Sequence, residues 1–358
     1  PYSIIGNLAA LGGAEDQEEV LESKPAPVQF DPEVFEGLYG RELRLRMDGY
    51  ALPERGVVVG TPSPSPTTID GHQLRPLRFW AGAHILKKQV GVCEDAYFAT
   101  PDSMGVADGV GCMVQFASYG INAAAYAAEL MENAAAALEE SHGSCPEAVT
   151  ERSMSAVAAA ESQAKTYGAS TIAVLTLHEA TVGVANLGDS GFMHLRKGQH
   201  GMVVVHKSEE QQHSWNCPYQ LTRLPPALMS KFPKAALDTA ADCEEYTFDV
   251  REGDLILMYS DGLHDNLHDR EVLHIVDCAL SPVFAELIGL PEHSTDPDRI
   301  ARALALAAQE RSLDPVAKVP FTEYSKKHGY ECHGGKQDDI TVVAAWLVAD
   351  ESPVADAE

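Results

Sequence analysis

Positive charge is scarce in this sequence. Lys and Arg together number 26 against 53 Asp and Glu, so the formal net charge is -27. A surface of this sign repels nucleic-acid phosphates and anionic membranes, and both are therefore excluded as expected partners. A basic or neutral partner meets no such barrier. With 358 residues, of which 45% are hydrophobic, the chain has enough apolar material for a sizeable core.

Paired cysteine motifs and long apolar runs are also missing. The seven cysteines are scattered and never occur in CxxC spacing, so neither a disulfide framework nor a thiolate zinc site is indicated. A reducing compartment fits this usage. No apolar run approaches the roughly 18 residues of a membrane span, so we expect no membrane insertion. The composition predicts a soluble, intracellular protein.

Turn-forming residues divide the chain. The segment TPSPSP (residues 61–66) excludes helix and interior strand because of its repeated proline, and from residue 77 short apolar runs alternate with Gly, Asp and Asn. We predict a partly ordered N-terminal extension over residues 1–75. A folded domain over residues 76–348 and an acidic tail over residues 349–358 would follow.

The pattern within the folded part predicts segregated helices and strands. Helices are expected at 121–140, 146–165, 269–280 and 296–311, where strong helix formers dominate or where proline or aspartate begins the run. Strands are expected at 170–177, 181–186, 191–196 and 202–206, and their short links predict antiparallel neighbours. Further strands are expected at 246–250 and 254–259, which would form a hairpin turning at Glu252-Gly253, and at 340–347. This arrangement indicates an α+β fold with helices covering antiparallel sheets.

Acidic residues stand at the ends of five apolar runs. The segments are VCEDAYF, GVADGVG, ANLGDSG, MYSDGLHDN and GGKQDDITVV. Carboxylates that meet on packed strand ends repel one another and have raised pKa values unless cations neutralise them. Oxygen ligands without a His or Cys cluster favour Mg²⁺ or Mn²⁺ over zinc or copper. Since Asp-Gly is also common in ordinary turns, the residues alone leave turn aspartates and a metal site as equal alternatives.

The order of these motifs resembles the protein phosphatase 2C family. The series ED, ADGVG, NLGDSG, SDGLxDN and GGKxDDITV extends over about residues 77–347, and HKSEEQQHSWNCPYQL (residues 206–221) is similar to the subgroup with mitochondrial and plastid members and the T-cell-activation phosphatase homologue. The resemblance implies a four-layer αββα sandwich of two antiparallel sheets flanked by helix pairs. It also implies a monomer in the cytoplasm or in an organelle of the mitochondrial or plastid kind.

The same resemblance implies the activity. Phosphoserine and phosphothreonine in proteins would be hydrolysed by a metal-activated water, without a phospho-enzyme intermediate. Two Mg²⁺ or Mn²⁺ ions would be bound, with a weaker third. The sequence agrees in having neither a CxxxxxR nucleophile loop nor a DxDx(T/V) motif.

Matching positions assign the two-ion site. By resemblance, Asp108 bridges the two ions and the carbonyl of Gly109 binds one of them. Asp261 and Asp338 complete the other ion's coordination. These four positions form the expected centre.

Matching positions also assign the surrounding residues. Glu94 and Asp95 would hold coordinated waters, and Asp189 and Asp265 would form the weaker third site together with the centre. Asp339 stands where relatives often have Asn and would support the ligands without binding an ion.

The phosphate-binding arginine of many family members is missing. Its position, four residues before the Glu of the ED motif, is Val90 in this chain. Lys87 and Lys88 lie nearby, and either would be a substitute, although surface lysines are usually just solvated.

The histidine that follows the first Asp-Gly in many members is missing as well, and Val110 stands there. His264 and His213 are candidate replacements as the acid for the leaving alcohol. For His213 the simpler expectation is a loop histidine that packs on Trp215.

Two other functions remain open on sequence. The losses at Val90 and Val110 are compatible with a catalytically weak pseudophosphatase that binds phosphoproteins as a scaffold. A metal-dependent hydrolase of small phosphate esters would use the same residues. Because Asp108, Asp261 and Asp338 are all present, the sequence favours an active protein phosphatase.

Overall fold

The computed structural model of the chain describes residues 68–69, 72–73, 76–141, 149–230, 237–280 and 296–350. Most of the predicted N-terminal extension and acidic tail lies outside these residues, so their boundaries remain predictions. Within the extension, β1 (Thr68–Ile69) pairs with β2 (His72–Gln73) in a short antiparallel hairpin. The last strand, β16, ends at Ala349, one residue beyond the predicted end of the folded domain.

Two five-stranded sheets form the centre of the molecule. The first sheet has the order β14-β8-β7-β5-β4, and the second has the order β10-β9-β15-β16-β3. All pairings within both sheets are antiparallel. The strands of the first sheet are β4 (Asp95–Ala99), β5 (Ser103–Asp108), β7 (Ile172–His178), β8 (Thr181–Leu187) and β14 (Glu244–Asp249). Those of the second are β3 (Leu77–Leu86), β9 (Gly191–Gly198), β10 (Gly201–Lys207), β15 (Leu255–Tyr259) and β16 (Ile340–Ala349).

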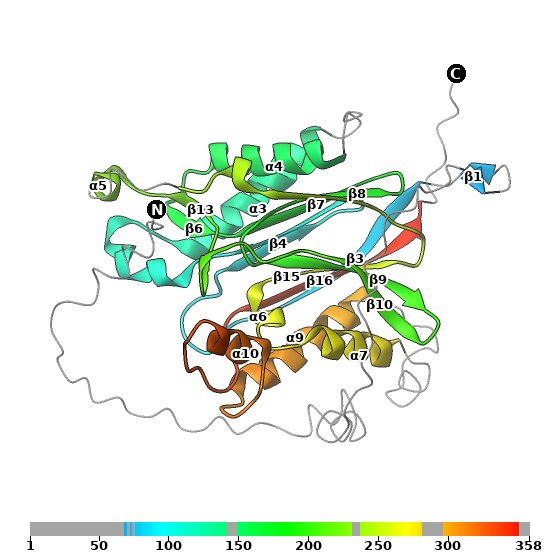
Figure 1. Cartoon of the computed structure of the whole chain (residues 1–358). Helices are drawn as coiled ribbons and strands as arrows, with labels where there is room; N and C mark the ends of the chain where they lie inside the picture. The colour runs from blue at the N-terminus through cyan, green and yellow to red at the C-terminus, as the bar shows by residue number, and fades with distance from the viewer. Residues whose placement is uncertain are drawn as a thin grey trace.

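Helices cover the outer face of each sheet (Figure 1). The pair α3 (Ala123–Glu140) and α4 (Val149–Gln163) packs on the first sheet, and the pair α7 (Asp269–Ala279) and α9 (Pro297–Leu313) packs on the second. Three hydrophobic clusters fill the spaces between the four layers. The predicted α+β class and αββα layering are therefore confirmed.

Burial on both faces explains the continuous apolar runs of the central strands. In β15, Leu255 and Leu257 pack toward α7 and α9, whereas Ile256 and Met258 pack between the sheets. Side chains alternate between the two faces of a strand, so a strand covered on both sides is apolar at every position. A continuous apolar run of this kind therefore reflects burial on both faces.

Small side chains and polar caps explain the helices. Ala127 and Ala134 of α3 are fully buried, which lets the helix approach the first sheet closely. The side chain of Asn122 accepts a hydrogen bond from the backbone N–H of Ala125 at the start of α3, and Asp296 caps α9 in the same way through Asp298. No helix among the described residues combines the length and apolarity that a bilayer crossing requires.

Two expected pairings are wrong. The strands β14 and β15 do not form the predicted hairpin, because they belong to different sheets. The loops between the four strands predicted over residues 170–206 are short, so each strand was expected to pair with the next. The strands β8 and β9 nevertheless belong to different sheets. Gly188 adopts a left-handed φ of 107°, and a Cβ at this position would lie 2.6 Å from the carbonyl oxygen of Tyr219. This turn carries the chain from one sheet to the other. Asp189 lies in the crossing.

Shorter elements surround one edge of the sandwich. The strand β13 pairs with β6, and β11 pairs with β12 in a small hairpin. The sequence analysis did not predict α6 or α10. These shorter elements are η1 (Gly111–Tyr119), β6 (Gly168–Ser170), β11 (Gln212–Ser214), β12 (Cys217–Pro218), β13 (Leu221–Arg223), α5 (Pro226–Met229), η2 (Ala240–Asp242), α6 (Asp261–His264) and α10 (Pro320–Lys327).

A buried ion pair joins β9 to the beginning of β15. Asp254 accepts two hydrogen bonds from Arg196, at 2.8 and 2.6 Å, and lies 2.8 Å from Nε2 of His194. Burial by itself would raise the pKa of Asp254, but these partners outweigh it and lower the pKa from 3.8 to about 2. The ionised carboxylate is therefore favoured in the folded protein.

This lowered pKa predicts how stability depends on pH. Asp254 contributes to the free energy of unfolding at pH values above about 4, which is the pKa of this carboxyl group in the unfolded chain. The contribution is lost as the pH falls toward about 2, the pKa in the folded protein. We expect Asp254→Asn to lower the free energy of unfolding at pH 7 by about 2 kcal/mol and to flatten its decrease between pH 4 and pH 2. Urea unfolding at several pH values measures both. Glu252→Gln, which changes an exposed turn residue, is the control.

Candidate metal centre

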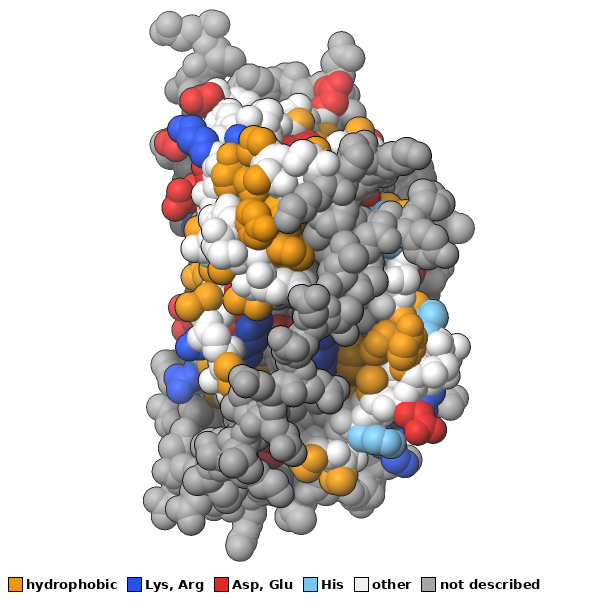
Figure 2. Space-filling model, turned by 90° about the vertical axis from the view of Figure 1, so that its left-hand side faces the viewer, with side chains coloured by type: hydrophobic (Ala, Val, Ile, Leu, Met, Phe, Trp, Pro, Cys, Tyr) orange, Lys and Arg blue, Asp and Glu red, His pale blue; other side chains and the backbone are white. Residues whose placement is uncertain are grey.

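Acidic residues from both sheets meet at one edge of the sandwich. Asp108 ends β5, and Asp261 follows β15 at the first position of α6. Asp338 lies just before β16, and Asp189 lies in the crossing between β8 and β9. Asp95 begins β4 and faces Asp108 directly in the strand register. Segments far apart in the sequence therefore bring five carboxylates together. Figure 2 shows the side of the molecule on the left of Figure 1, with Lys and Arg side chains near the middle.

Asp95 is held rigidly within this group. Its Oδ2 accepts hydrogen bonds from Ser260 Oγ at 2.7 Å and from Thr341 Oγ1 at 2.6 Å. Its Oδ1 is buried and has no hydrogen-bond partner among the described residues. A buried carboxylate oxygen without a donor is costly, and here a bound cation would satisfy it.

Burial and mutual repulsion raise the pKa values of these acids. Burial is the larger cause for each, and neighbouring carboxylates add to it. The pKa of Asp95 is raised to about 7 and that of Asp189 to about 8. The pKa of Asp108 is raised well above its ordinary value, and that of Asp338 is also raised. The cluster thus requires positive charge to remain ionised at neutral pH.

Lys336 supplies part of that charge. Its ammonium group contacts the carboxylate of Asp261 and lies 2.7 Å from Asp265 and 3.6 Å from Asp338. The side chain of Asn266 fixes the backbone of Lys336 through hydrogen bonds of 2.9 Å to both its N–H and its carbonyl. The second oxygen of Asp261, Oδ1, is buried without a partner among the described residues.

Lys88 supplies charge on the other side of the cluster. Its Nζ lies 2.8 Å from Glu94 and 3.3 Å from both Asp338 and Asp339. Lys87 is exposed. Of the two lysines that the sequence offered as phosphate ligands, the structure brings Lys88 into the cluster.

Asp339 and two close contacts shape the loop that carries Glu94. The carboxylate of Asp339 accepts hydrogen bonds from the backbone N–H groups of Lys88 at 2.8 Å and Glu94 at 2.9 Å. The N–H of Gly109 donates to the carbonyl of Glu94 at 3.0 Å. A Cβ on Gly262 would lie 2.1 Å from the carbonyl oxygen of Asp339, so only glycine permits this approach.

The donor set fits hard cations. In the described parts of the chain, no three His, Cys, Asp or Glu side chains are already arranged to hold an ion, and two lysine ammonium groups contact the carboxylates. The Oδ1 atoms of Asp95 and Asp261 are nevertheless carboxylate oxygens that are buried without a hydrogen-bond partner among the described residues. Such donors suit Mg²⁺ or Mn²⁺.

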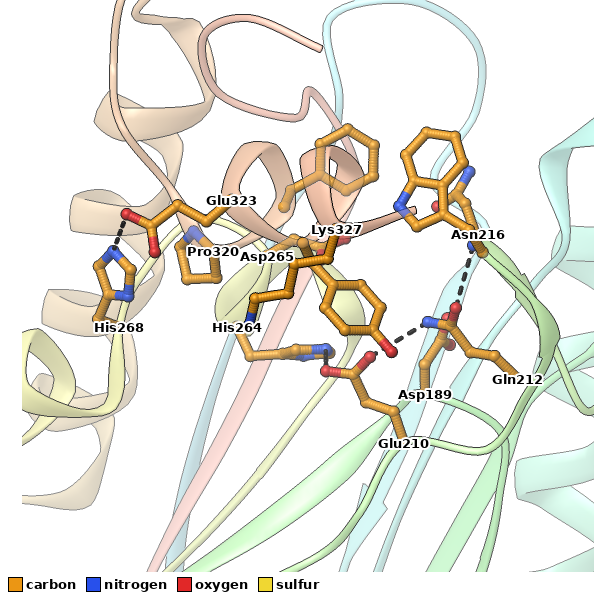
Figure 3. A pocket seen from close by; sticks show the side chains of 13 residues that line it. Asp189, Glu210, Gln212, Asn216, His264, Asp265, His268, Pro320, Glu323 and Lys327 are labelled. Atoms are coloured by element: carbon orange, nitrogen blue, oxygen red, sulfur yellow. Dashed lines mark hydrogen bonds and ion pairs between the residues drawn. The ribbon is translucent and has the colours of Figure 1, made fainter. Parts of the chain in front are cut away.

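Asp189 and Asp265 line a pocket on the outer side of this cluster (Figure 3). His264 also lines it, and its Nε2 lies 3.1 Å from Glu210. Burial would lower the pKa of His264, but Glu210 and Asp265 outweigh it and raise the pKa to about 9. The sequence analysis did not single out Glu210, and its position before the HSW segment carried no signal.

The two valines at the family's arginine and histidine positions lie in different surroundings. Val90 is 81% exposed, so no side chain at this position replaces the expected arginine. Val110 packs against a small hydrophobic cluster that includes Met113 and Ile121. A valine here has no group that can transfer a proton.

His213 packs elsewhere than expected. The sequence predicted that it stacks on Trp215, and this is wrong. Its ring stacks on Tyr219 with centroids 4.0 Å apart, and its Nε2 lies 2.9 Å from Asp238. Trp215 instead stacks on Tyr330, at 4.3 Å. The turn of the β11–β12 hairpin separates these neighbouring side chains.

The fold and the acidic edge together define a sandwich of two antiparallel sheets with an oxygen-rich site at the strand ends. Residues 82–305 match the family described as Protein phosphatase 2C. The chain is 34% identical over 298 residues to the Probable protein phosphatase 2C 80 of Arabidopsis thaliana, covering 81% of this chain and 63% of that protein. It is 33% identical over 269 residues to the Protein phosphatase PTC7 homolog of Homo sapiens, covering 72% and 81%. This chain belongs to the protein phosphatase 2C family.

A solved structure supports the same fold. The photosystem II phosphatase PBCP is similar with a TM-score of 0.61 and 25% identity, over 76% of this chain and 100% of that one. The chain spans 63% and 53% of the lengths of two Arabidopsis relatives that it matches. The predicted resemblance to the family and to the PTC7 subgroup is confirmed.

Lys336 belongs to the acidic segment GGKQDDITVV, and sequence reasoning provided no ground to assign this lysine to the site. Its ammonium group neutralises carboxylates that ions would otherwise neutralise. In EDTA, we expect Lys336→Met to lower the free energy of unfolding by about 3 kcal/mol, because a buried charge loses its partner. The loss should shrink in saturating Mn²⁺. Urea unfolding under both conditions measures it, with the exposed Lys87→Met as control. An equal loss with and without Mn²⁺ would contradict this role.

Proposed function

We propose that this protein hydrolyses phosphoserine and phosphothreonine in proteins, with two Mg²⁺ or Mn²⁺ ions and a weaker third. The observation that carries the proposal is the buried group of carboxylates from both sheets, with the Oδ1 atoms of Asp95 and Asp261 unpaired. Its relatives named as protein phosphatases support the activity. Residues 76–348 would form the catalytic domain of a monomer that acts on phosphoproteins, in the cytoplasm or in an organelle.

The ligand positions follow from the two sheets. Asp108 would bridge the two ions from the end of β5, with the carbonyl of Gly109 beside it. Asp261 and Asp338 would hold the second ion from the second sheet. Since the two sheets supply ligands from opposite sides, the packing between the sheets sets the separation of these carboxylates.

The remaining acids would support that centre. Glu94 and Asp95 would hold coordinated waters, and Asp339 fixes the backbone of Glu94 through a hydrogen bond of 2.9 Å. Asp189 and Asp265 would hold the weaker third ion on the side of the pocket. When bound, the ions would supply charge for the phosphoryl oxygens and a water activated for attack.

Lys88 is the phosphate ligand that the geometry favours. Its ammonium group lies between Glu94 and Asp338, whereas Val90 at the family's arginine position is exposed. Once ions neutralise those carboxylates, the same ammonium group is free to contact a substrate phosphate. A lysine binds phosphate as a point charge without the paired geometry of arginine.

The scaffold function has less support than the enzyme. A protein that only binds phosphoproteins needs no group of buried carboxylates whose repulsion raises their pKa values. That cost is understandable where the carboxylates bind ions for catalysis. A hydrolase of small phosphate esters would share the site, and substrate comparison separates the two.

Asp108→Asn tests the proposed centre. The variant removes one negative charge from the residue assigned to bridge both ions, so we expect weaker Mn²⁺ binding and a loss of about 10²-fold or more in turnover of a phosphopeptide. Calorimetric Mn²⁺ titration and phosphate release measure the two effects. Unchanged Mn²⁺ affinity together with unchanged turnover would show that Asp108 is not a ligand.

The valine at position 110 predicts a strong dependence on the leaving group. A general acid is typically worth about 10² to 10⁴ in rate, and an acidic phenol needs it least. We therefore expect aryl phosphates to be cleaved much faster than phosphoserine, and Val110→His to improve phosphoserine selectively. Rates for a series of aryl and alkyl phosphates measure this dependence.

Two histidine variants complete that experiment. His264→Ala removes the histidine that lines the pocket beside the cluster, and His213→Ala is the matched control, since His213 is bound to Asp238 and stacked on Tyr219. If the wild-type dependence is shallow and His264→Ala makes it steep, His264 is the proton donor and the absence of an acid is disproved.

A further inference from the structure

A pocket lies beside the carboxylate cluster, and most of its lining residues have no role in the proposed centre. Its volume is about 250 Å³, and it lies between the β11–β12 hairpin and α10. We call it the α10 pocket; it is lined among others by Asp189, Glu210, Trp215, Asp265, Phe321 and Glu323. It opens next to the proposed centre, because Asp265 shares the ammonium group of Lys336 with Asp261. A peptide whose phosphate reaches the centre therefore brings neighbouring side chains to this pocket.

One wall of the α10 pocket is aromatic. Trp215 stacks on Tyr330 with centroids 4.3 Å apart and lies 5.3 Å from the ring of Phe321. These rings come from the hairpin, from α10 and from the segment after it, so the wall exists only in the folded protein. Aromatic faces attract ammonium and guanidinium groups and also pack against the aliphatic stems that carry them.

The inner end of the pocket is acidic. Asp189 lines the pocket and is only 5% exposed. Glu210 is held in place by His264 at 3.1 Å and by Gln212 at 3.1 Å, as Figure 3 shows. Two carboxylates that line the same end of a pocket suit a cationic ligand.

The outer end of the pocket carries charges of both signs. Glu323 lies at this end, and its side chain is 56% exposed. Lys327 is the only lysine or arginine among the lining residues, and its ammonium group lies 5.9 Å from the ring of Tyr324. Four carboxylates line the pocket against Lys327 and His264, so negative charge is in excess and a cationic side chain is favoured there.

We propose that the α10 pocket binds a lysine or arginine side chain of the phosphoprotein substrate, close in sequence to the phosphorylated residue. The proposal rests on the proposed phosphatase function and names the substrate feature that the enzyme selects. The aliphatic stem would pack on Trp215 and Phe321, and the cationic tip would reach Asp189 and Glu210. Because Asp189 is also assigned to the weak third ion, a basic side chain and that ion would compete.

Matched phosphopeptides test this. The peptides carry Arg, Lys, norleucine or Asp at single positions within about three residues of the phosphoserine, which is roughly 10 Å of extended chain. At one or more positions we expect kcat/KM for Arg and Lys peptides to exceed that for norleucine by about tenfold, corresponding to about 1.4 kcal/mol. The preference should fall in 1 M salt, where the Debye length is about 3 Å, and at high Mn²⁺.

Two variants locate the preference. Trp215→Ala and Glu323→Gln should each reduce the preference for basic peptides. Glu323→Gln should leave kcat/KM for the norleucine peptide unchanged, whereas Trp215→Ala also removes the ring on which an aliphatic stem would pack. Glu331→Gln, an exposed acid outside the lining residues, is the matched charge control. Thermal unfolding checks that Trp215→Ala still folds, and Glu323→Gln, on an exposed side chain, keeps the test available if it does not.

A binding measurement separates failure of the pocket from failure of the proposed function. The chain has three tryptophans, so a peptide-dependent fluorescence change that disappears in Trp215→Ala reports binding at the pocket. If no peptide is hydrolysed but basic peptides still bind preferentially, the proposed function fails and the pocket stands. If all peptides are hydrolysed and bound equally, or if the preference persists in both pocket variants, the pocket proposal is overturned.

Discussion

Repulsion between buried carboxylates sets the conditions for the rest of the site. Asp95 and Asp108 face each other across neighbouring strands, and burial together with the neighbouring acids raises the pKa values of both. Such a group is unfavourable in a folded protein unless positive charge lies within it. Lys88 and Lys336 provide this charge, and the unpaired oxygens of Asp95 and Asp261 leave positions that divalent ions can fill.

The sandwich makes this arrangement possible because its central strands are buried on both faces. Strands such as β15 and β16 are covered on both faces, so they withstand the cost of acids at their ends. Asp261 follows β15 and Asp338 precedes β16, and these strands pair directly. Asp108 approaches from the first sheet. A shift of one sheet relative to the other would change the spacing of the ligands.

The surroundings of the centre differ on its two sides. On one side, Asp339 holds the loop with Lys88 and Glu94 through backbone hydrogen bonds. On the other, the hairpin with Trp215 and the helix α10 enclose a pocket. Under the proposed function, the first side would hold the phosphate and the ions, and the second would distinguish the side chains near the phosphorylated residue. Catalysis and substrate choice would thus be separated across the same group of acids.

Local sequence determined the elements and the acidic positions. The apolar period and the turn residues predicted the long helices, most central strands and the α+β class, because these signals act within a few residues. The ordered acidic motifs located Asp108, Asp261 and Asp338 at strand ends.

Only the tertiary structure decided that β8 and β9 lie in different sheets. The left-handed turn at Gly188 permits this crossing but does not specify it. It also decided that Lys336 enters the cluster, that Lys88 and not Lys87 does so, and that Trp215 stacks on Tyr330. Each of these contacts joins residues distant in the chain, and packing of whole layers, which no local pattern encodes, brings them together.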